Sequence, residues 1–492
     1  MPPATPRGFP TLSGSSEEDR QAMANRAVAS SLQSHRKQAK SEVTDRKSID
    51  RKSAVAMKFT SPRGMRDFYP HEKAWHNHLL DTWRRVSVRN GFEHVDGPIF
   101  ESLDLYKVKS GEGIVSELFS FRRQGGKTDY AIRPEFTPTL ARMVAQRANS
   151  LPTPIKWFSI PNLCRAEKPQ RGRLREHWQW NVDIMGLQGA GADAEVMFTA
   201  IDFFRELNLG PEHLRVKISH RQTARHILSR LGVVDDDMLA AFDLLDKRDK
   251  IPREAFVQEA AKLGLDEDRV HRLEQTTRMK YRCGELDQMR QQLGMDEDLR
   301  DLAALDEQLH AFGIAPWCEY DLGIVRGLAY YTGTVFEIHE ISGAERAVAG
   351  GGRYDKLIEL FGGPSIPAVG FGMGDVVISL VLDDKNLLRD DVAPRPDAFV
   401  FALTDAGAKA LPGYVAMLRR ADVHTRFSYR TTRNVGRLLK EADAVGARYA
   451  VLLDDDVAEG TVQLKDLSVG GQEPVAIKAV ADLIRKRESA QG

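Results

Sequence analysis

Residues 162–186 read N-L-C-R-A-E-K-P-Q-R-G-R-L-R-E-H-W-Q-W-N-V-D-I-M-G, and the second half of this stretch decides the fold. Apolar and polar residues alternate there: Trp178, Trp180, Val182 and Ile184 take turns with His177, Gln179, Asn181 and Asp183. Successive side chains of a strand point to opposite faces. The alternation therefore predicts a strand with one face on an apolar core and a second, polar face.

A strongly basic loop leads into this strand. Within eleven residues it carries five cations, which are Arg165, Lys168, Arg171, Arg173 and Arg175. Such a loop, followed in register by an amide and a carboxylate, suits a ligand with a polyphosphate end and a cationic end. The alternative is an exposed hairpin with a solvated basic tip, because charge runs are usually solvated surface.

The composition is that of a soluble globular protein of roughly three domains. Lys plus Arg and Asp plus Glu both number 70, so any nucleic-acid contact must come from a local patch rather than from net charge. No stretch approaches the ~18 apolar residues that span a bilayer, so no membrane segment is expected. Cys164, Cys283 and Cys318 are widely spaced, which predicts buried thiols in a reducing, cytoplasmic setting rather than a zinc ribbon or a disulfide framework.

Changes in composition divide the chain into four parts. Residues 1–57 are rich in Ser, Ala, Gln, Arg and Lys and are expected to be a disordered extension, or else to precede a true start at Met57. The extension lacks a secretory signal and has too many acidic residues for a transit peptide. The expected folded parts are a core of residues 58–221 and 313–390, a helical insertion of residues 222–312 and an α/β domain of residues 396–492. The expected fold class is α+β.

Five motifs occur in an order that resembles the histidyl-tRNA synthetases, a family of class II aminoacyl-tRNA synthetases. They are R-G-M-R-D-F-Y-P at 63–70, R-P-E-F-T-P-T-L-A-R at 133–142, the arginine hairpin, V-R-G-L-A-Y-Y-T-G-T-V-F-E at 325–337 and G-G-G-R-Y-D-K-L-I-E-L-F-G-G at 350–363. The resemblance implies an antiparallel active-site sheet, a homodimer and a last domain that binds the anticodon. It also implies activation of L-histidine by ATP, with Mg²⁺, and transfer of histidine to its tRNA.

The resemblance also assigns roles to individual residues. It implies Arg165 and Arg326 as catalytic residues and Arg165, Glu167 and Arg173 as ATP contacts. The implied histidine contacts are Glu135, Thr137, Gln179, Asp183, Arg326, Tyr330 and Tyr331. Read alone, Thr137 could be a helix N-cap and the two tyrosines a packed pair. No protein-bound metal cage is expected, because Mg²⁺ keeps water and phosphate ligands.

The chain departs from the family pattern where a phosphate-binding arginine is expected. The third class II motif reads G-F-G-M-G-D-V-V at 370–377, so Val377 takes the arginine position and Val376 the position of an acidic residue, and Ala329 replaces an aspartate. Either another cation (Arg173, Arg175 or Arg353) binds the end of ATP, or ATP binding is weakened. Glycines 350–352 do not have P-loop spacing and are expected to permit close backbone packing.

Two further hypotheses follow from these features. A catalytically silent relative, similar to the regulatory subunit of ATP phosphoribosyltransferase, would bind histidine without aminoacylation. The intact pair Arg165 and Arg326 and the last domain argue against it. A basic patch in that domain, formed by Arg426, Arg430, Arg433 and Arg437, could contact tRNA phosphates or be solvated surface.

Overall fold

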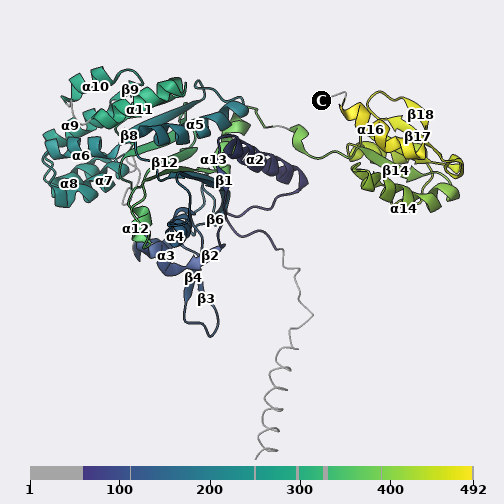
Figure 1. Cartoon of the computed structure of the whole chain (residues 1–492), viewed down its shortest axis with the longest axis horizontal. Coiled ribbons are helices and arrows are strands. Elements are labelled where there is room, and N and C mark those ends of the chain that lie inside the picture. Colours follow the sequence, from purple (N-terminus) through teal and green to yellow (C-terminus); the bar gives the residue numbers. More distant parts are fainter. Residues whose placement is uncertain are drawn as a thin grey trace, which may run out of the picture. The chain divides into compact units, whose positions relative to one another are not determined.

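The computed structural model describes residues 59–110, 112–248, 251–294, 299–324, 331–388 and 390–489 (Figure 1). The expected extension of residues 1–57 lies outside this range, and so do Arg326 and Tyr330. The described chain contains a core built on one large sheet and, from residue 398 on, a smaller α/β domain.

A mixed ten-stranded sheet forms the centre of the core, in the order β1-β5-β7-β13-β12-β11-β8-β10-β9, with β6 paired to β7. The strands are β1 (Glu93–His94), β5 (Ile155–Ser159), β6 (Asn162–Cys164), β7 (Glu176–Met185), β8 (Leu214–His220), β9 (Lys280–Arg282), β10 (Cys318–Asp321), β11 (Thr334–Glu340), β12 (Ala349–Arg353) and β13 (Ala368–Gly374). The pairs from β5 through β8 are antiparallel, whereas β1–β5 and β8–β10 are parallel. The expected α+β class and antiparallel centre are confirmed.

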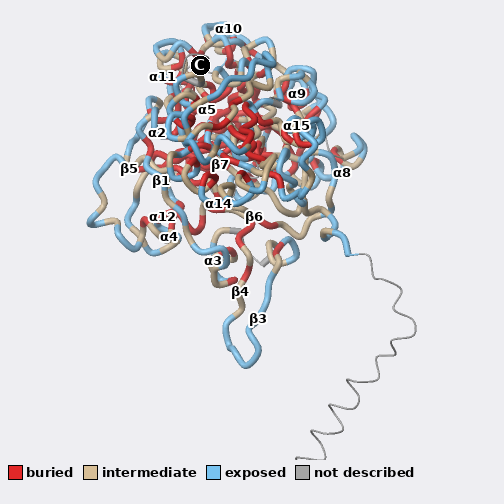
Figure 2. Tube along the Cα trace, turned by 90° about the vertical axis from the view of Figure 1, so that its right-hand side faces the viewer, coloured by how far each residue is buried: buried red, intermediate tan, exposed pale blue. Residues whose placement is uncertain are grey.

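Strand β7 has the two faces that its alternation predicts. Trp180, Val182 and Ile184 are fully buried on one face. The Trp180 ring lies 6.0 Å from the Trp83 ring of helix α2 and 5.5 Å from the Phe203 ring of helix α5. Figure 2 shows the buried residues concentrated around β7, whereas the tip of the β3–β4 hairpin is exposed. The apolar face therefore belongs to the core, and the side chains of the polar face can line a cavity on the other side of the sheet.

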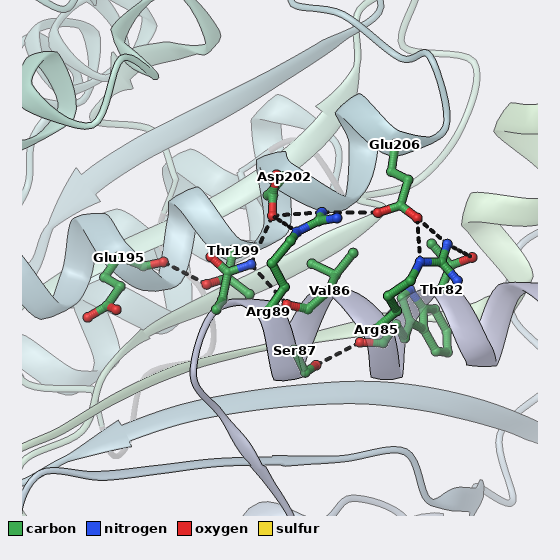
Figure 3. Close-up of polar contacts among 11 residues, drawn as sticks. Thr82, Arg85, Val86, Ser87, Arg89, Glu195, Thr199, Asp202 and Glu206 are labelled. Atoms are coloured by element: carbon green, nitrogen blue, oxygen red, sulfur yellow. Dashed lines mark hydrogen bonds and ion pairs between the residues drawn. The ribbon is translucent and has the colours of Figure 1, made fainter.

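Helices α2 (Pro70–Arg89) and α5 (Ala190–Glu206) lie against each other behind this face. Ion pairs join their outer sides, as Figure 3 shows: Arg89 Nη2 lies 2.9 Å from Asp202 Oδ2, and Arg85 pairs with Glu206. The Asn90–Gly91 pair directly after α2 is a typical helix end, whereas α5 ends at Glu206 and does not continue to Gly210. Asn208 takes a left-handed backbone (φ 58°), and the Leu209 N–H returns to the Phe204 carbonyl, which closes the helix early.

The remaining core elements surround the sheet. A small sheet in the order β2-β4-β3 contains β2 (Phe100–Ser102), β3 (Ser120–Arg122) and β4 (Asp129–Ile132). The other helices are α3 (Leu103–Ser110), α4 (Thr137–Arg147), α6 (Arg221–Arg230), α7 (Met238–Lys247), α8 (Arg253–Lys262), α9 (Glu267–Arg278), α10 (Leu286–Leu293), α11 (Arg300–Ala311), α12 (Leu357–Leu360) and α13 (Asp375–Asp384). Most of residues 222–312 are thus helical, although β9 joins the main sheet. Phe136 is the N-cap of α4, so the alternative of Thr137 as N-cap is wrong.

The last domain has a five-stranded sheet in the order β15-β14-β16-β17-β18. Its elements are β14 (Ala398–Ala402), α14 (Asp405–Arg420), β15 (Thr425–Phe427), α15 (Val435–Ala444), β16 (Tyr449–Leu453), β17 (Thr461–Asp466), β18 (Gln472–Ala476) and α16 (Val480–Ser489). The pairs β14–β15 and β14–β16 are parallel and the pairs β16–β17 and β17–β18 are antiparallel, so the sheet is mixed, as an α/β domain allows. Strand β18 was not predicted because it is an exposed edge strand that contains Pro474.

Two cysteines that are distant in sequence meet in the main sheet. Arg282 pairs with Glu319 across β9 and β10, so the next residue, Cys283, faces Cys318. Burial and a hydrogen bond between its thiol and Cys283 raise the pKa of Cys318, and burial raises the pKa of Cys164 to about 11. All three cysteines are free, and the burial of Cys164 and Cys318 fits the expected structural role, whereas Cys283 is only partly buried. No described helix has the length and hydropathy needed to cross a membrane.

Candidate active site

Two adjoining cavities open on the polar face of β7. The larger has a volume of about 590 Å³ and the smaller about 130 Å³. Four residues line both of them, namely Arg165, Gln179, Gly350 and Gly372. Since Arg165 follows β6 and Gln179 lies on β7, the arginine hairpin and the strand after it meet where the cavities join.

Most of the predicted histidine contacts surround the smaller cavity. Its lining includes Glu135, Thr137, Gln179, Asp183 and Tyr331, together with Asn181 and Tyr354. They come from the start of α4, from β7 and from the segments on either side of β11 and β12. The two remaining predicted contacts, Arg326 and Tyr330, fall outside the described residues. A polar cavity of this size can hold one small amino acid and little else.

Asp183 is the buried carboxylate of this cavity. Its side chain is almost fully enclosed, and the Tyr354 hydroxyl donates a hydrogen bond to Oδ1. Burial raises the pKa of Asp183 to about 7, although the hydrogen bond from Tyr354 acts in the opposite direction. A cationic ammonium group placed beside Asp183 would stabilise the ionised form. Sequence reasoning assigned no role to Tyr354, although it lies in the same motif as the glycine run of β12, two residues after Gly352.

Glycines on β12 and β13 create the room for these side chains. A Cβ on Gly370 would lie 2.1 Å from Asp183 Oδ1, and one on Gly372 would lie 2.5 Å from Gln179 Nε2. A Cβ on Gly351 would lie 2.1 Å from the Gly370 carbonyl oxygen of the neighbouring strand. The expectation that glycines 350–352 permit close backbone packing is confirmed, since β12 is a regular strand inside the sheet.

Glu135 enters the smaller cavity beside a lysine that sequence reasoning did not consider. The nearly buried Lys109 of α3 forms an ion pair with the Glu135 carboxylate. Lys109 lies in a helix with no recognisable motif, so the sequence holds no signal for this contact. The pair fixes one carboxylate at the wall of the cavity opposite β7.

The larger cavity carries positive charge on the side of the arginine hairpin. Arg165 and Arg173 line it, and Arg165 Nε donates to the Pro134 carbonyl at 2.9 Å. His177 also lines it; burial and the nearby Arg165 charge lower the pKa of His177 to about 4. His177 is therefore neutral at pH 7, so the positive charge on this side of the cavity comes from guanidinium groups, while Asp246 and Glu337 line it as carboxylates.

The five hairpin cations do not act as one group. Arg171 Nη2 lies 2.5 Å from Glu345 Oε1 and 3.2 Å from Asp384 Oδ2, and Arg175 Nε donates to the Glu167 carbonyl at 3.0 Å. Arg173 forms an ion pair with Glu167, a predicted ATP contact that does not itself line either cavity. Three of the five hairpin cations thus have protein partners, so the hairpin does not present all five to one ligand.

Arg353 was one candidate for the missing phosphate-binding arginine, and the structure excludes it. Its guanidinium is buried, lies 2.6 Å from Asp193 Oδ1 and 3.2 Å from Asp355 Oδ1, and donates to the Leu187 and Gly189 carbonyls. It lines a separate cavity of about 490 Å³. Arg353 holds β12 to α5, so it cannot reach the larger cavity.

Helix α13 begins with a buried aspartate beside the valine that replaces the expected arginine. Asp375 accepts hydrogen bonds from Arg66 Nη2 at 2.6 Å and from the Trp178 N–H at 3.0 Å, and His76 Nε2 lies 3.4 Å away. Burial alone would raise the pKa of Asp375, but His76 and the Arg66 charge outweigh burial and lower it. The start of α13 therefore binds the opening motif, while Val377 forms part of the cavity wall.

Comparison with known proteins agrees with this geometry. The family model for histidyl-tRNA synthetase matches residues 64–374, and the model for an anticodon binding domain matches residues 397–487. The chain belongs to the histidyl-tRNA synthetase family. A histidine–tRNA ligase of Opitutus terrae is 36% identical over 87% of this chain and 98% of its own length. One of Halobacterium salinarum is 37% identical over 85% of this chain and 96% of its own.

Solved structures show the same fold. The histidyl-tRNA synthetase of Nostoc sp. PCC 7120 superimposes with a TM-score of 0.72 at 24% identity, covering 88% of this chain and all of that one. The predicted histidyl-tRNA synthetase is confirmed by these matches, and the regulatory relative is not favoured. Within the described residues no cluster of three or more His, Cys, Asp or Glu side chains could hold a metal ion.

Proposed function

We propose that this protein is a class II histidine–tRNA ligase that uses ATP to attach L-histidine to the 3′ end of its tRNA. One observation carries this proposal: Arg165 lies at the junction of a cavity sized for one amino acid and a larger cationic cavity. Adenylate formation requires such a junction, because the carboxylate of the amino acid must meet the α-phosphate of ATP there. The catalytic core comprises residues 58–221 and 313–390, with residues 222–312 inserted.

The smaller cavity binds histidine in this proposal. Asp183 and Glu135 pair with the ammonium group, and Thr137 and Gln179 orient the amino acid by hydrogen bonds. Tyr330 and Tyr331 line the imidazole pocket, where a phenol can hydrogen-bond a ring nitrogen. The histidine carboxylate then points toward Arg165.

In the first step, a histidine carboxylate oxygen attacks the α-phosphorus of ATP and pyrophosphate leaves. Arg165 and Arg326 counter the charge that develops on the phosphoryl oxygens, which favours the transition state over the ground state. Arg173 contacts the phosphates, and Glu167 contacts the adenine amino group. Mg²⁺ bound through phosphates and water fits this site, because Glu337 on the wall is a carboxylate that can face it.

In the second step, a ribose hydroxyl of the terminal tRNA adenosine attacks the acyl carbon and AMP leaves. The anticodon binding domain holds the other end of the tRNA. Its basic patch (Arg426, Arg430, Arg433 and Arg437) lies in the same stretch of chain as the largely exposed Tyr429, and such a combination suits phosphate contact with base stacking. We also propose a cytoplasmic homodimer, with the dimer formed through the opening motif.

Single-turnover formation of histidyl-adenylate tests the proposal. Arg165→Ala is expected to slow the chemical step by roughly 10²- to 10³-fold, as for loss of one group that stabilises transition-state charge. Arg326→Ala is expected to slow it similarly while circular dichroism shows an intact fold. Near wild-type rates in both variants would contradict the assigned roles. Histidine binding without any adenylate in the wild-type protein would instead favour a regulatory histidine-binding protein.

A further inference from the structure

The larger cavity has an apolar wall where the end of a nucleoside triphosphate would lie. Val377, in the first turn of α13, is 7% exposed and lines this cavity together with Val376. A valine cannot bind phosphate, and Arg353 and Arg175 are held by other partners. The third candidate, Arg173, lines the cavity but forms an ion pair with Glu167, so the end of ATP calls for a further cation at this wall.

Arg346 lies at this same wall. It belongs to the loop between β11 and β12, and the register pairs Ala349 of β12 with Met373 of β13. Because the two strands are antiparallel, the loop before β12 runs beside the residues that follow β13. The point where a Cβ on Gly172 would lie is 3.4 Å from Val377 Cγ2 and 3.7 Å from Arg346 Cδ. The Arg346 and Val377 side chains thus both approach Gly172, and both line the larger cavity.

The charge of Arg346 is not neutralised by a protein partner. Within the described part of the chain, its guanidinium forms no ion pair or hydrogen bond. The adjacent carboxylate, Glu345, is buried and forms its ion pair with Arg171 at 2.5 Å. Arg346 is exposed to solvent at the cavity, so an anion that enters the cavity can reach its guanidinium.

Three guanidinium groups therefore face one cavity. Burial lowers the pKa of Arg173, and the charges of Arg346 and Arg165 lower it further. Glu117 and Glu167 offset part of this repulsion, and a polyanion bound among the three guanidinium groups would offset more of it. The arrangement places Arg165 at the amino-acid end of the cavity and Arg346 beside Val377.

We propose that Arg346 binds the terminal phosphate of ATP and takes the place of the arginine expected at position 377. This inference rests on the proposed function and adds a residue to its ATP site. A planar guanidinium can bind two phosphate oxygens at once. Arg346 then also contacts pyrophosphate as that group leaves in the first step.

Histidine-dependent ATP–pyrophosphate exchange by the full chain tests the role of Arg346. Arg346→Ala should raise the KM for ATP roughly 10- to 100-fold, the range for loss of a charge-assisted hydrogen bond. The KM for histidine should stay unchanged, and Arg346→Lys should recover part of the ATP affinity. Arg225→Ala is the matched control, because Arg225 is an exposed arginine that pairs with Asp235 at 2.8 Å and lines neither cavity.

Equilibrium binding identifies which part of the nucleotide Arg346 contacts. Arg346→Ala should weaken binding of the β,γ-methylene analogue of ATP and leave AMP binding unchanged. An unchanged KM for ATP, or an equal loss for AMP, would overturn the assignment while wild-type exchange still supported the proposed function. Absence of exchange in the wild-type protein would contradict the proposed function and the role of Arg346 with it.

Discussion

At the residue scale, Asp183 links the chemistry of the smaller cavity to pH. Its pKa is raised to about 7 in the free protein, so it is largely protonated at pH 6. A histidine ammonium group favours the ionised carboxylate, and histidine affinity should therefore rise as pH increases through 7. From pH 6 to pH 8 the ionised fraction, and with it the affinity, should increase roughly tenfold.

Calorimetric titration of histidine between pH 6 and pH 8.5 measures this dependence. The imidazole of histidine titrates in the same range. Asp183→Asn is therefore the control, because ligand titration is common to both proteins. The histidine affinity of the wild-type protein should rise between pH 6 and pH 8 by more than ligand titration alone gives, and that of Asp183→Asn should not. Parallel pH profiles for the two proteins would contradict the role of Asp183.

The residues of the smaller cavity differ in how well sequence could predict them. Gln179 and Asp183 follow from the alternation of β7, because period two fixes which side chains share a face. Lys109 and Tyr354 do not follow, since their contacts depend on how α3 and β12 pack against distant segments. Hairpin cations such as Arg171 were over-assigned, because a run of charges does not tell which carboxylates, here Glu345, lie nearby in the fold.

At the scale of elements, Asp375 joins the start of α13 to the opening motif and to β7. Its carboxylate is fully buried and accepts hydrogen bonds from the Arg66 guanidinium and from the Trp178 N–H. Removing one partner of a buried ion pair typically costs about 3–5 kcal/mol. We expect Asp375→Ala to lower the free energy of unfolding of the core by this order, measured by urea denaturation.

Asp384→Ala is the matched control for this prediction. Asp384 ends the same helix, but its side chain is 49% exposed and pairs with Arg171 at the surface. Its loss should cost less than about 1 kcal/mol. Because the pKa of Asp375 is lowered in the folded state, the stability it contributes is present near neutral pH and lost as pH falls through that pKa. Equal stability of the two variants would contradict the anchoring role.

Elements with strong periodicity were predicted well from sequence, and others were not. Strand β7 and helix α2 have apolar residues at the spacing of their structure, so burial and pattern agree. The end of α5 and the edge strand β18 depend on a left-handed asparagine and on pairing with β17, which leave no periodic signal. The meeting of Cys283 and Cys318 likewise depends on the pairing of β9 with β10.

At the scale of the whole molecule, the order of motifs along the chain was the most informative feature. Net charge and composition excluded only broad classes of protein, such as membrane-spanning and disulfide-rich ones. Five ordered motifs indicated one family, to which the chain belongs. They could not indicate how the cavity compensates for Val377, because Arg346 lies in a loop outside every motif. In the proposed function, histidine and ATP occupy two cavities joined at Arg165 and react there.

The most direct test is ATP–pyrophosphate exchange with each of the twenty amino acids in turn. The purified full chain should exchange pyrophosphate into ATP with histidine and with no other amino acid. Such a result would show adenylate chemistry in a site that lacks an arginine at position 377. Retained histidine binding without exchange, or comparable exchange with another amino acid, would contradict the account.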